Sequence, residues 1–215
     1  MNNIKDTSHL GGHNGNNTML PNEIKYFRDI LGVRSIIDIG CGPAWMVEYN
    51  NFMGIYSEGI EGDRIIHPKE YINFHDFTEG PFIPNKYYDL AYSVEFLEHV
   101  EEKYIPNFMP VFDKVNYIFC TSAIPGQGGY HHVNEQSKMY WIDKFQERGF
   151  VYDNKIFKDL LEVSAVKSFI GKNGLFLRRK EPIINIEYAT PYEIPNAMLN
   201  INYYLNYYVR VGGAV

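Results

Sequence analysis

The chain has 215 residues, of which 45% are hydrophobic, 21% charged and 16% aromatic, and its formal net charge is −6. This length and apolar content are those of one folded domain, and they exclude a chain that is disordered throughout. The 26 acidic residues outnumber the 20 basic residues, which argues against nucleic acid as a partner, because proteins that bind polyanions depend on Lys and Arg.

The number of cysteines and the hydropathy of the sequence indicate the cellular location. Cys41 and Cys120 are too few for a disulfide framework and are not spaced as a zinc motif. This is typical of a reducing cell interior, so we expect a cytoplasmic protein. The amino-terminal segment has no signal-peptide pattern, and no apolar run approaches the roughly 18 residues of a membrane span. We therefore expect no membrane partner.

In chain order, residues 1–20 are rich in Gly, Asn and His, and we expect either a flexible lid over a site or a plain flexible terminus. Apolar residues at helical spacing then predict a helix over 22–31. Short apolar runs, predicted as strands, alternate with further helical patterns. The predicted strands are 35–40, 53–61, 71–76, 89–95, 116–123, 150–154 and 174–179. The further predicted helices begin near Glu98 and cover 136–149 and 156–170.

This alternation predicts an α/β fold, a Rossmann-like doubly wound and mostly parallel seven-stranded sheet over residues 21–180. Residues 181–215 depart from the pattern and are rich in Tyr. We expect them to form a carboxy-terminal extension packed on the core, and an oligomer contact is the alternative. The oligomeric state stays open.

The first candidate site follows the first predicted strand, where the sequence reads DIGCGPA (38–44). In an open α/β sheet, ligands bind beyond the carboxyl ends of the strands, and Gly40 and Gly42 allow a sharp turn and a close approach. Glu61 ends the second predicted strand, where an acid commonly binds a ribose diol. A dinucleotide-binding turn would need a third glycine where Trp45 stands. A purely structural turn is the other alternative.

The third predicted strand ends in a second pair of candidate residues. The carboxylate of Asp76 is placed to accept a hydrogen bond from an adenine amino group, and Phe77 is placed to cover the ring. Together with Glu61, these residues predict a nucleoside-containing cofactor at this edge of the sheet.

Four runs in this order, IIDIGCGPA, GIEGD, HDF and YDLAYSVEFLEHV, resemble the class I S-adenosylmethionine-dependent methyltransferases over roughly residues 24–180. The resemblance implies a methyltransferase with S-adenosylmethionine as cofactor. A degenerate fold that serves only as a binding subunit would be expected to lose these glycines and acids, which are present. The cofactor-binding residues it implies are Asp38, Gly40, Cys41, Gly42, Glu61, Asp76, Phe77 and Ser93.

The second candidate site follows the fourth predicted strand, in SVEFLEHV. If a helix begins near Glu95, then Glu95, Glu98 and His99 share one face of it. Two carboxylates and an imidazole suit a divalent cation. The ordinary alternative is that the acids stabilise a helix amino terminus and that the histidine packs or caps. The glycine-rich stretch 123–137 would bring two more histidines, His131 and His132, to the same edge.

The Glu-x-x-Glu-His run resembles that of small-RNA 3′-terminal 2′-O-methyltransferases and, more loosely, of ubiquinone-pathway O-methyltransferases. The resemblance implies that Mg²⁺ or Mn²⁺ lowers the pKa of an acceptor hydroxyl and that a free histidine takes the proton. A metal-free enzyme would use His99 or His131 as the base. The implied metal ligands are Glu95, Glu98, His99 and His132, or His131 in place of His132. We expect the catalytic groups among Glu95, His99, His131 and His132.

Three acceptor classes remain, namely a sugar hydroxyl, an RNA ribose and a phenolic metabolite. Tyr130, Tyr140 and Trp141 would provide aromatic faces for a sugar. The stretch GQGGYHHVNEQSKMYWIDKF is also similar to small methyltransferases of phages and large DNA viruses, often found alongside glycosyltransferases. We therefore expect a sugar or glycan acceptor, a glycosyltransferase as a possible partner, and the host cytoplasm as the location if the source is viral.

Overall fold

The computed structural model describes residues 8–10, 18–64 and 68–184. Most of the expected lid, residues 1–20, and most of the expected extension, residues 181–215, lie outside the described residues. Among the residues that are described, no helix is long and apolar enough to cross a membrane.

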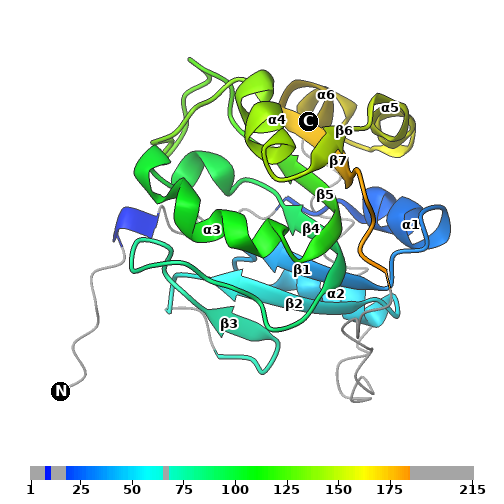
Figure 1. Ribbon diagram of the computed structural model, residues 1–215, viewed down its shortest axis with the longest axis horizontal. Helices are drawn as coiled ribbons and strands as arrows, with labels where there is room; N and C mark the ends of the chain where they lie inside the picture. Colours follow the sequence, from blue (N-terminus) through cyan, green and yellow to red (C-terminus); the bar gives the residue numbers. More distant parts are fainter. Residues whose placement is uncertain (1–7, 11–17, 65–67, 185–215) are drawn as a thin grey trace.

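A seven-stranded sheet forms the centre of the molecule, in the order β3-β2-β1-β4-β5-β7-β6 (Figure 1). The strands are β1 (Ser35–Ile39), β2 (Tyr56–Glu61), β3 (Ile72–Phe74), β4 (Tyr88–Ser93), β5 (Val115–Thr121), β6 (Phe150–Tyr152) and β7 (Gly174–Arg179). The first five strands pair in parallel, whereas β7 runs antiparallel to both β5 and β6. The predicted fold class is therefore confirmed.

Helices cover both faces of the sheet. They are α1 (Pro21–Asp29), α2 (Trp45–Phe52), α3 (Ile105–Phe112), α4 (Lys138–Gln146), α5 (Asn154–Val163) and α6 (Lys167–Asn173). Successive side chains of a strand point to opposite faces, so Ile37 and Ile36 of β1 enter different cores. Ile37 belongs to the core that includes residues of α3 and α4, and Ile36 belongs to the core that includes residues of α1, α5 and α6. This two-sided burial explains the continuous apolar runs of the parallel strands.

Two predicted helices differ from the structure. The helix expected to begin near Glu98 begins only at Ile105, after two short 3₁₀ helices, η2 (Leu97–His99) and η3 (Glu102–Tyr104). Glu95 has a positive φ of 56° and Val100 is extended, so no regular helix passes through this segment. The predicted helix 156–170 is divided into α5 and α6, because the backbone is extended at Ser164.

Candidate functional site

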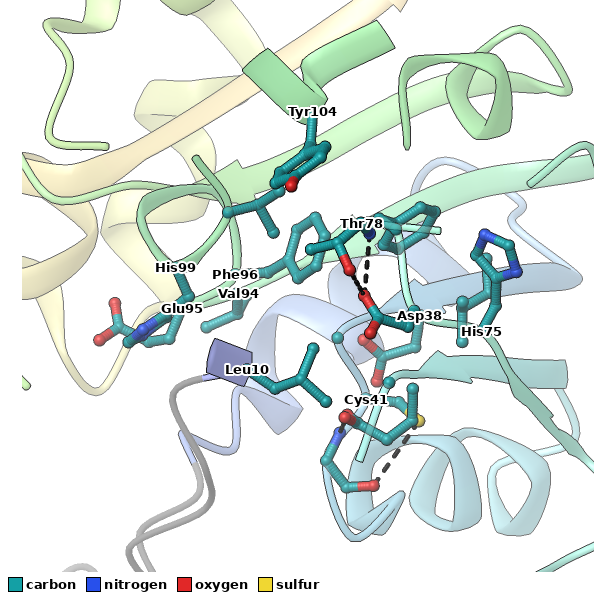
Figure 2. A pocket seen from close by; sticks show the side chains of 18 of the residues that line it. Leu10, Asp38, Cys41, His75, Thr78, Val94, Glu95, Phe96, His99 and Tyr104 are labelled. Carbon is teal, nitrogen blue, oxygen red and sulfur yellow. Dashed lines mark hydrogen bonds between the residues drawn. The ribbon is translucent and has the colours of Figure 1, made fainter. Parts of the chain in front are cut away.

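A cavity of about 560 Å³ opens at the carboxyl ends of β1, β2 and β4. Figure 2 shows Asp38 and Cys41 on one side of it and Glu95 and His99 on the other, with Phe96 and Val94 between. The cavity therefore joins the two candidate sites. Of the predicted site residues, those that line it are Asp38, Gly40, Cys41, Gly42, Glu61, Asp76, Phe77, Glu95, His99 and His132.

Three predicted site residues lie behind this lining. Ser93 is fully buried at the end of β4, Glu98 is fully buried in η2, and neither lines the cavity. His131 also stays outside the lining, and its Nδ1 is buried with no hydrogen-bond partner among the described residues. Of the histidine pair, His132 is thus the one that faces the cavity.

The glycine turn after β1 has the tight geometry that its sequence predicts. Gly40 and Gly42 have φ values of 74° and 54°, which glycine adopts without strain. A Cβ atom on Gly40 would lie 2.6 Å from Cδ2 of Phe96. The N–H of Gly42 donates to Oε2 of Glu61 at 2.8 Å. The acid at the end of β2 therefore binds the turn that follows β1, and both belong to the cavity wall.

Two buried carboxyl groups lie at this end of the cavity. Asp38 is 3% exposed and Glu61 is 6% exposed. Burial and the neighbouring charge of Glu61 raise the pKa of Asp38 well above its usual value. Burial also raises the pKa of the Cys41 thiol, which makes it an inert neutral group. A positively charged ligand in this part of the cavity would oppose the rise in the pKa of Asp38 and favour its ionised form.

Asp76 lies after β3, at the place where an adenine-binding acid is expected. Its Oδ1 accepts hydrogen bonds from the N–H and the hydroxyl of Thr78, at 2.8 Å and 2.7 Å. Its Oδ2 lies 2.8 Å from Nε2 of His9. Burial by itself would raise the pKa of Asp76, but these hydrogen bonds outweigh burial and lower it. The side chain of Phe77 packs beside it against Phe96, with ring centroids 5.6 Å apart.

The short helix η1 (Ser8–Leu10) contributes residues that the sequence patterns do not identify individually. His9 and Leu10 both line the cavity. A Cβ atom on Gly62 would lie 2.9 Å from Cδ2 of Leu10, so the segment after β2 lies directly against η1. The Gly- and Asn-rich composition of residues 1–20 suggested only a lid in general. The role of the whole segment as a lid stays a prediction.

Backbone contacts bring the second candidate site together from two loops. The carbonyl oxygen of Glu98 accepts from the N–H groups of Val133 and Asn134, at 2.9 Å and 3.1 Å. The side-chain amide of Asn134 donates to the carbonyl oxygen of Val100 at 3.0 Å. These bonds join the segment after β4 to the glycine-rich segment after β5. The rings of His99 and His132 consequently lie 5.2 Å apart and nearly perpendicular.

The pKa values of the two carboxyl groups in this corner are raised above their usual values. Oε1 of Glu98 accepts from the N–H of Ala123 at 3.1 Å, and Oε2 is buried with no hydrogen-bond partner among the described residues. Burial and the neighbouring Glu95 raise the pKa of Glu98 to about 8. Burial also raises the pKa of Glu95, although the neighbouring His132 opposes the shift.

The metal site expected here is not preformed. Within residues 8–10, 18–64 and 68–184, no three or more His, Cys, Asp or Glu side chains are arranged to hold a metal ion. The shared helix face expected for Glu95, Glu98 and His99 is wrong, because the positive φ of Glu95 and the short η2 replace the helix. The expected ligands lie in one corner but do not surround a common point.

The expected aromatic platform is only partly formed. Tyr130 is 66% exposed and lines the cavity, together with Tyr104, which no sequence pattern identified. Trp141 is wrong as a platform residue, because it is fully buried in the core, with its ring centroid 6.4 Å from that of Phe108. Its i, i+4 spacing to the buried Phe145 was the signal that it belongs to the core.

No protein-family model matches the chain, and the comparison with curated proteins gives no match. Among solved structures, the methyltransferase domain of bacterial CtHen1 matches with a TM-score of 0.50 and 13% identity, over 73% of this chain and 94% of that one. The plantazolicin methyltransferase BpumL, in complex with SAH, matches with a TM-score of 0.50 and 13% identity, over 74% of this chain and 82% of that one. A SAM-dependent methyltransferase from Archaeoglobus fulgidus matches with a TM-score of 0.48 and 15% identity, over 73% of this chain and 92% of that one.

The comparison confirms the resemblance at the level of the fold. The CtHen1 domain and BpumL, each matching with a TM-score of 0.50, are methyltransferases, and the strand order of this chain is that of a mostly parallel, doubly wound sheet. The chain has the class I methyltransferase fold. At 13% identity the likeness says nothing about the acceptor, so the chemistry must be argued from the cavity itself.

Proposed function

We propose that the protein is an S-adenosylmethionine-dependent O-methyltransferase that acts on a sugar hydroxyl of a glycan or glycoside. The observation that carries the proposal is that one cavity contains both the glycine turn with its acids and the histidine corner. The first set suits a cationic nucleoside cofactor, and the second suits a hydroxyl that must lose a proton.

The cofactor end is supported by charge and shape. S-adenosylmethionine carries a positive sulfonium, and it supplies the methyl group when it is bound. Asp38 and Glu61 are buried acids beside the glycine turn, and a bound sulfonium would favour the ionised form of Asp38. Asp76 and Phe77 lie at the far edge, where an acid and an aromatic edge suit an adenine ring. These residues bind the cofactor and thereby orient its reacting methyl carbon.

The acceptor end has groups that can orient a hydroxyl and remove its proton. The acceptor oxygen forms a bond to the methyl carbon while the carbon–sulfur bond breaks and sulfur keeps the electron pair. The hydroxyl proton passes to an imidazole, for which His132 and His99 line the cavity. Because the displacement is in line, the main contribution of the protein is to hold the two reactants in position.

A sugar acceptor is the finer part of this proposal. The exposed Tyr130 and the neighbouring Tyr104 present aromatic faces at the histidine corner, and such faces pack against the apolar faces of sugars. The net charge of −6 disfavours an RNA ribose as the acceptor. A glycan acceptor would place the enzyme after a glycosyltransferase step. The cytoplasm, expected from the cysteine usage, is the proposed location.

A divalent cation is a separate part of the proposal. Two carboxylates and two imidazoles in one corner, with Oε2 of Glu98 lacking a hydrogen-bond partner, are the donor chemistry that supports it. When bound, Mg²⁺ or Mn²⁺ would lower the pKa of the acceptor hydroxyl. The residues expected to hold it are Glu95, Glu98, His99 and His132, which would have to rearrange because they do not surround a common point. Loss of activity in EDTA that returns with either ion supports the cation, and full activity in EDTA contradicts it.

Calorimetry with S-adenosylmethionine and S-adenosylhomocysteine tests the cofactor. We expect binding by the wild type, binding at least tenfold weaker for Asp38→Asn, and unchanged binding for the control Glu162→Ala, whose side chain is 82% exposed on α5. Absence of binding by the wild type contradicts the proposal.

Transfer of a labelled methyl group tests the acceptor, using matched glycosides with and without vicinal diols, RNA with a free 3′ ribose, and catechols. Labelling of glycosides supports the sugar acceptor. Labelling of RNA or catechol alone replaces it with that class.

A further inference from the structure

We propose that Glu135 is a positioning residue that holds the imidazole of His132 in one orientation and one tautomer at the cavity wall. This inference rests on the proposed function, because it explains which tautomer of His132 takes part in the proposed chemistry. No sequence pattern identified Glu135. Its carboxylate lies three residues after His132, between that histidine and the glycine-rich loop that follows β5.

Both oxygens of Glu135 are tied to the backbone of this loop. Oε2 accepts from the N–H of Gly126 at 2.7 Å, and Oε1 accepts from the N–H of Gly128 at 2.6 Å. These two glycines have φ values of 81° and 68°, a conformation that side chains rarely adopt. The carboxylate therefore has a fixed place, set by two short hydrogen bonds to a loop whose own path requires glycine.

The same carboxylate reaches His132. Oε1 of Glu135 lies 3.4 Å from Nδ1 of His132, in a side chain pair that is mostly buried. An ionised carboxylate only accepts hydrogen bonds, so Nδ1 must carry the proton. The lone pair of the neutral ring then lies on Nε2. That nitrogen is the one left to take a proton from an acceptor or to bind a cation, so the pairing serves both versions of the proposed chemistry.

A second contact restricts the ring at its Cε1 edge, between the two nitrogens. A Cβ atom on Gly129 would lie 2.3 Å from Cε1 and 2.5 Å from Nε2 of His132. The imidazole edge therefore packs directly on the backbone of residue 129, which has a φ of 152°. Glu135 fixes the Nδ1 side of the ring, and Gly129 provides the space that the ring occupies. Two independent features of the loop thus select one position for His132.

Three variants test this role. Glu135→Ala removes the acceptor, Glu135→Gln keeps one oxygen for Nδ1 but loses the second backbone contact, and Glu162→Ala is the control. The side-chain nitrogen signals of His132, assigned by their loss in His132→Gln, report the tautomer without any need for activity. We expect the Nδ1–H tautomer in the wild type, a mixture of tautomers in Glu135→Ala and an intermediate spectrum in Glu135→Gln.

Kinetics and cofactor binding complete the test. We expect kcat to fall about 10- to 100-fold in Glu135→Ala with little change in the acceptor KM or in the affinity for S-adenosylhomocysteine, and Glu135→Gln to recover part of kcat. An unchanged His132 spectrum in Glu135→Ala overturns the inference, as does a loss of cofactor affinity as large as the loss of kcat. If no acceptor is methylated at all, the proposed function fails, and the spectrum still decides the role of Glu135.

Discussion

Nε2 of His9 lies 2.8 Å from Oδ2 of Asp76, which joins the short helix η1 to the loop after β3 in the wall of the cavity. Because the neighbouring Leu10 also packs against the segment at Gly62, η1 lies beside the end of the cavity that we propose for adenine. We interpret the His9–Asp76 contact as a clasp that slows the departure of the cofactor.

Replacement of His9 tests this clasp. We expect His9→Ala to weaken S-adenosylhomocysteine binding about fivefold, since a partly exposed hydrogen bond to a charged group contributes ~1 kcal/mol. The change should lie in the dissociation rate, measured by stopped-flow displacement. The exposed Lys25→Ala on α1 is the control. Tighter binding by His9→Ala would show instead that His9 blocks the site.

The loss of stability at acidic pH should depend on Asp76. Its pKa is lowered in the folded protein, where hydrogen bonds from Thr78 and His9 outweigh burial. A lowered pKa contributes stability that is present above the unfolded value and is lost as the pH falls through the folded value. We expect Asp76→Asn to lower Tm at pH 7, and its difference from wild type to shrink between about pH 5 and pH 3.

The control for this pH series is Asp143→Asn, an exposed position on α4. Its difference from wild type should stay small at every pH. A deficit of Asp76→Asn that is constant, or that grows on acidification, would contradict the hydrogen-bonded carboxylate described here.

The glycine turn offers a matched pair of substitutions. Gly40 and Gly54 have φ values of 74° and 76°, but a Cβ on Gly40 would clash with Phe96, whereas nothing lies within 4 Å of one on Gly54. Gly54→Ala should cost about 1–2 kcal/mol of unfolding free energy from backbone strain alone. Gly40→Ala should cost about 1–3 kcal/mol more from the clash and also abolish cofactor binding. Equal costs in urea denaturation would contradict this packing.

Tyr130 and Trp141 should separate acceptor binding from stability. Tyr130→Ala is expected to raise the acceptor KM about 2- to 13-fold, from the loss of ~0.5–1.5 kcal/mol of aromatic contact, with Tm unchanged. Trp141→Ala should cost about 3–5 kcal/mol of stability, because it empties a core position. Met139→Ala, exposed on α4 and outside the cavity lining, is the control. An unchanged KM for Tyr130→Ala removes the aromatic platform from the proposal.

Local patterns gave a reliable prediction of the sheet, because a buried parallel strand must be apolar on both faces, as Ile36 and Ile37 are. The glycine turn was predictable for the same kind of reason, since Gly40 and Gly42 report positive φ directly. The start of the helix near Glu98, and its conditional start at Glu95, was predicted wrongly. Its spacing suits a helix, but the left-handed backbone at Glu95 is stabilised by contacts with distant residues, such as the N–H of Glu95 donating to Thr121.

The sequence by itself determined the fold class and the acids at the carboxyl ends of the first three strands, because both follow from periodicity and from where a strand ends. Only the tertiary structure decided which histidine faces the cavity, since that depends on the bonds from Val133 and Asn134 to Glu98. It also assigned Glu135 to His132 and placed Trp141 in the core. These contacts are between residues on separate loops or helix faces, and the spacing of residues within one segment does not predict them.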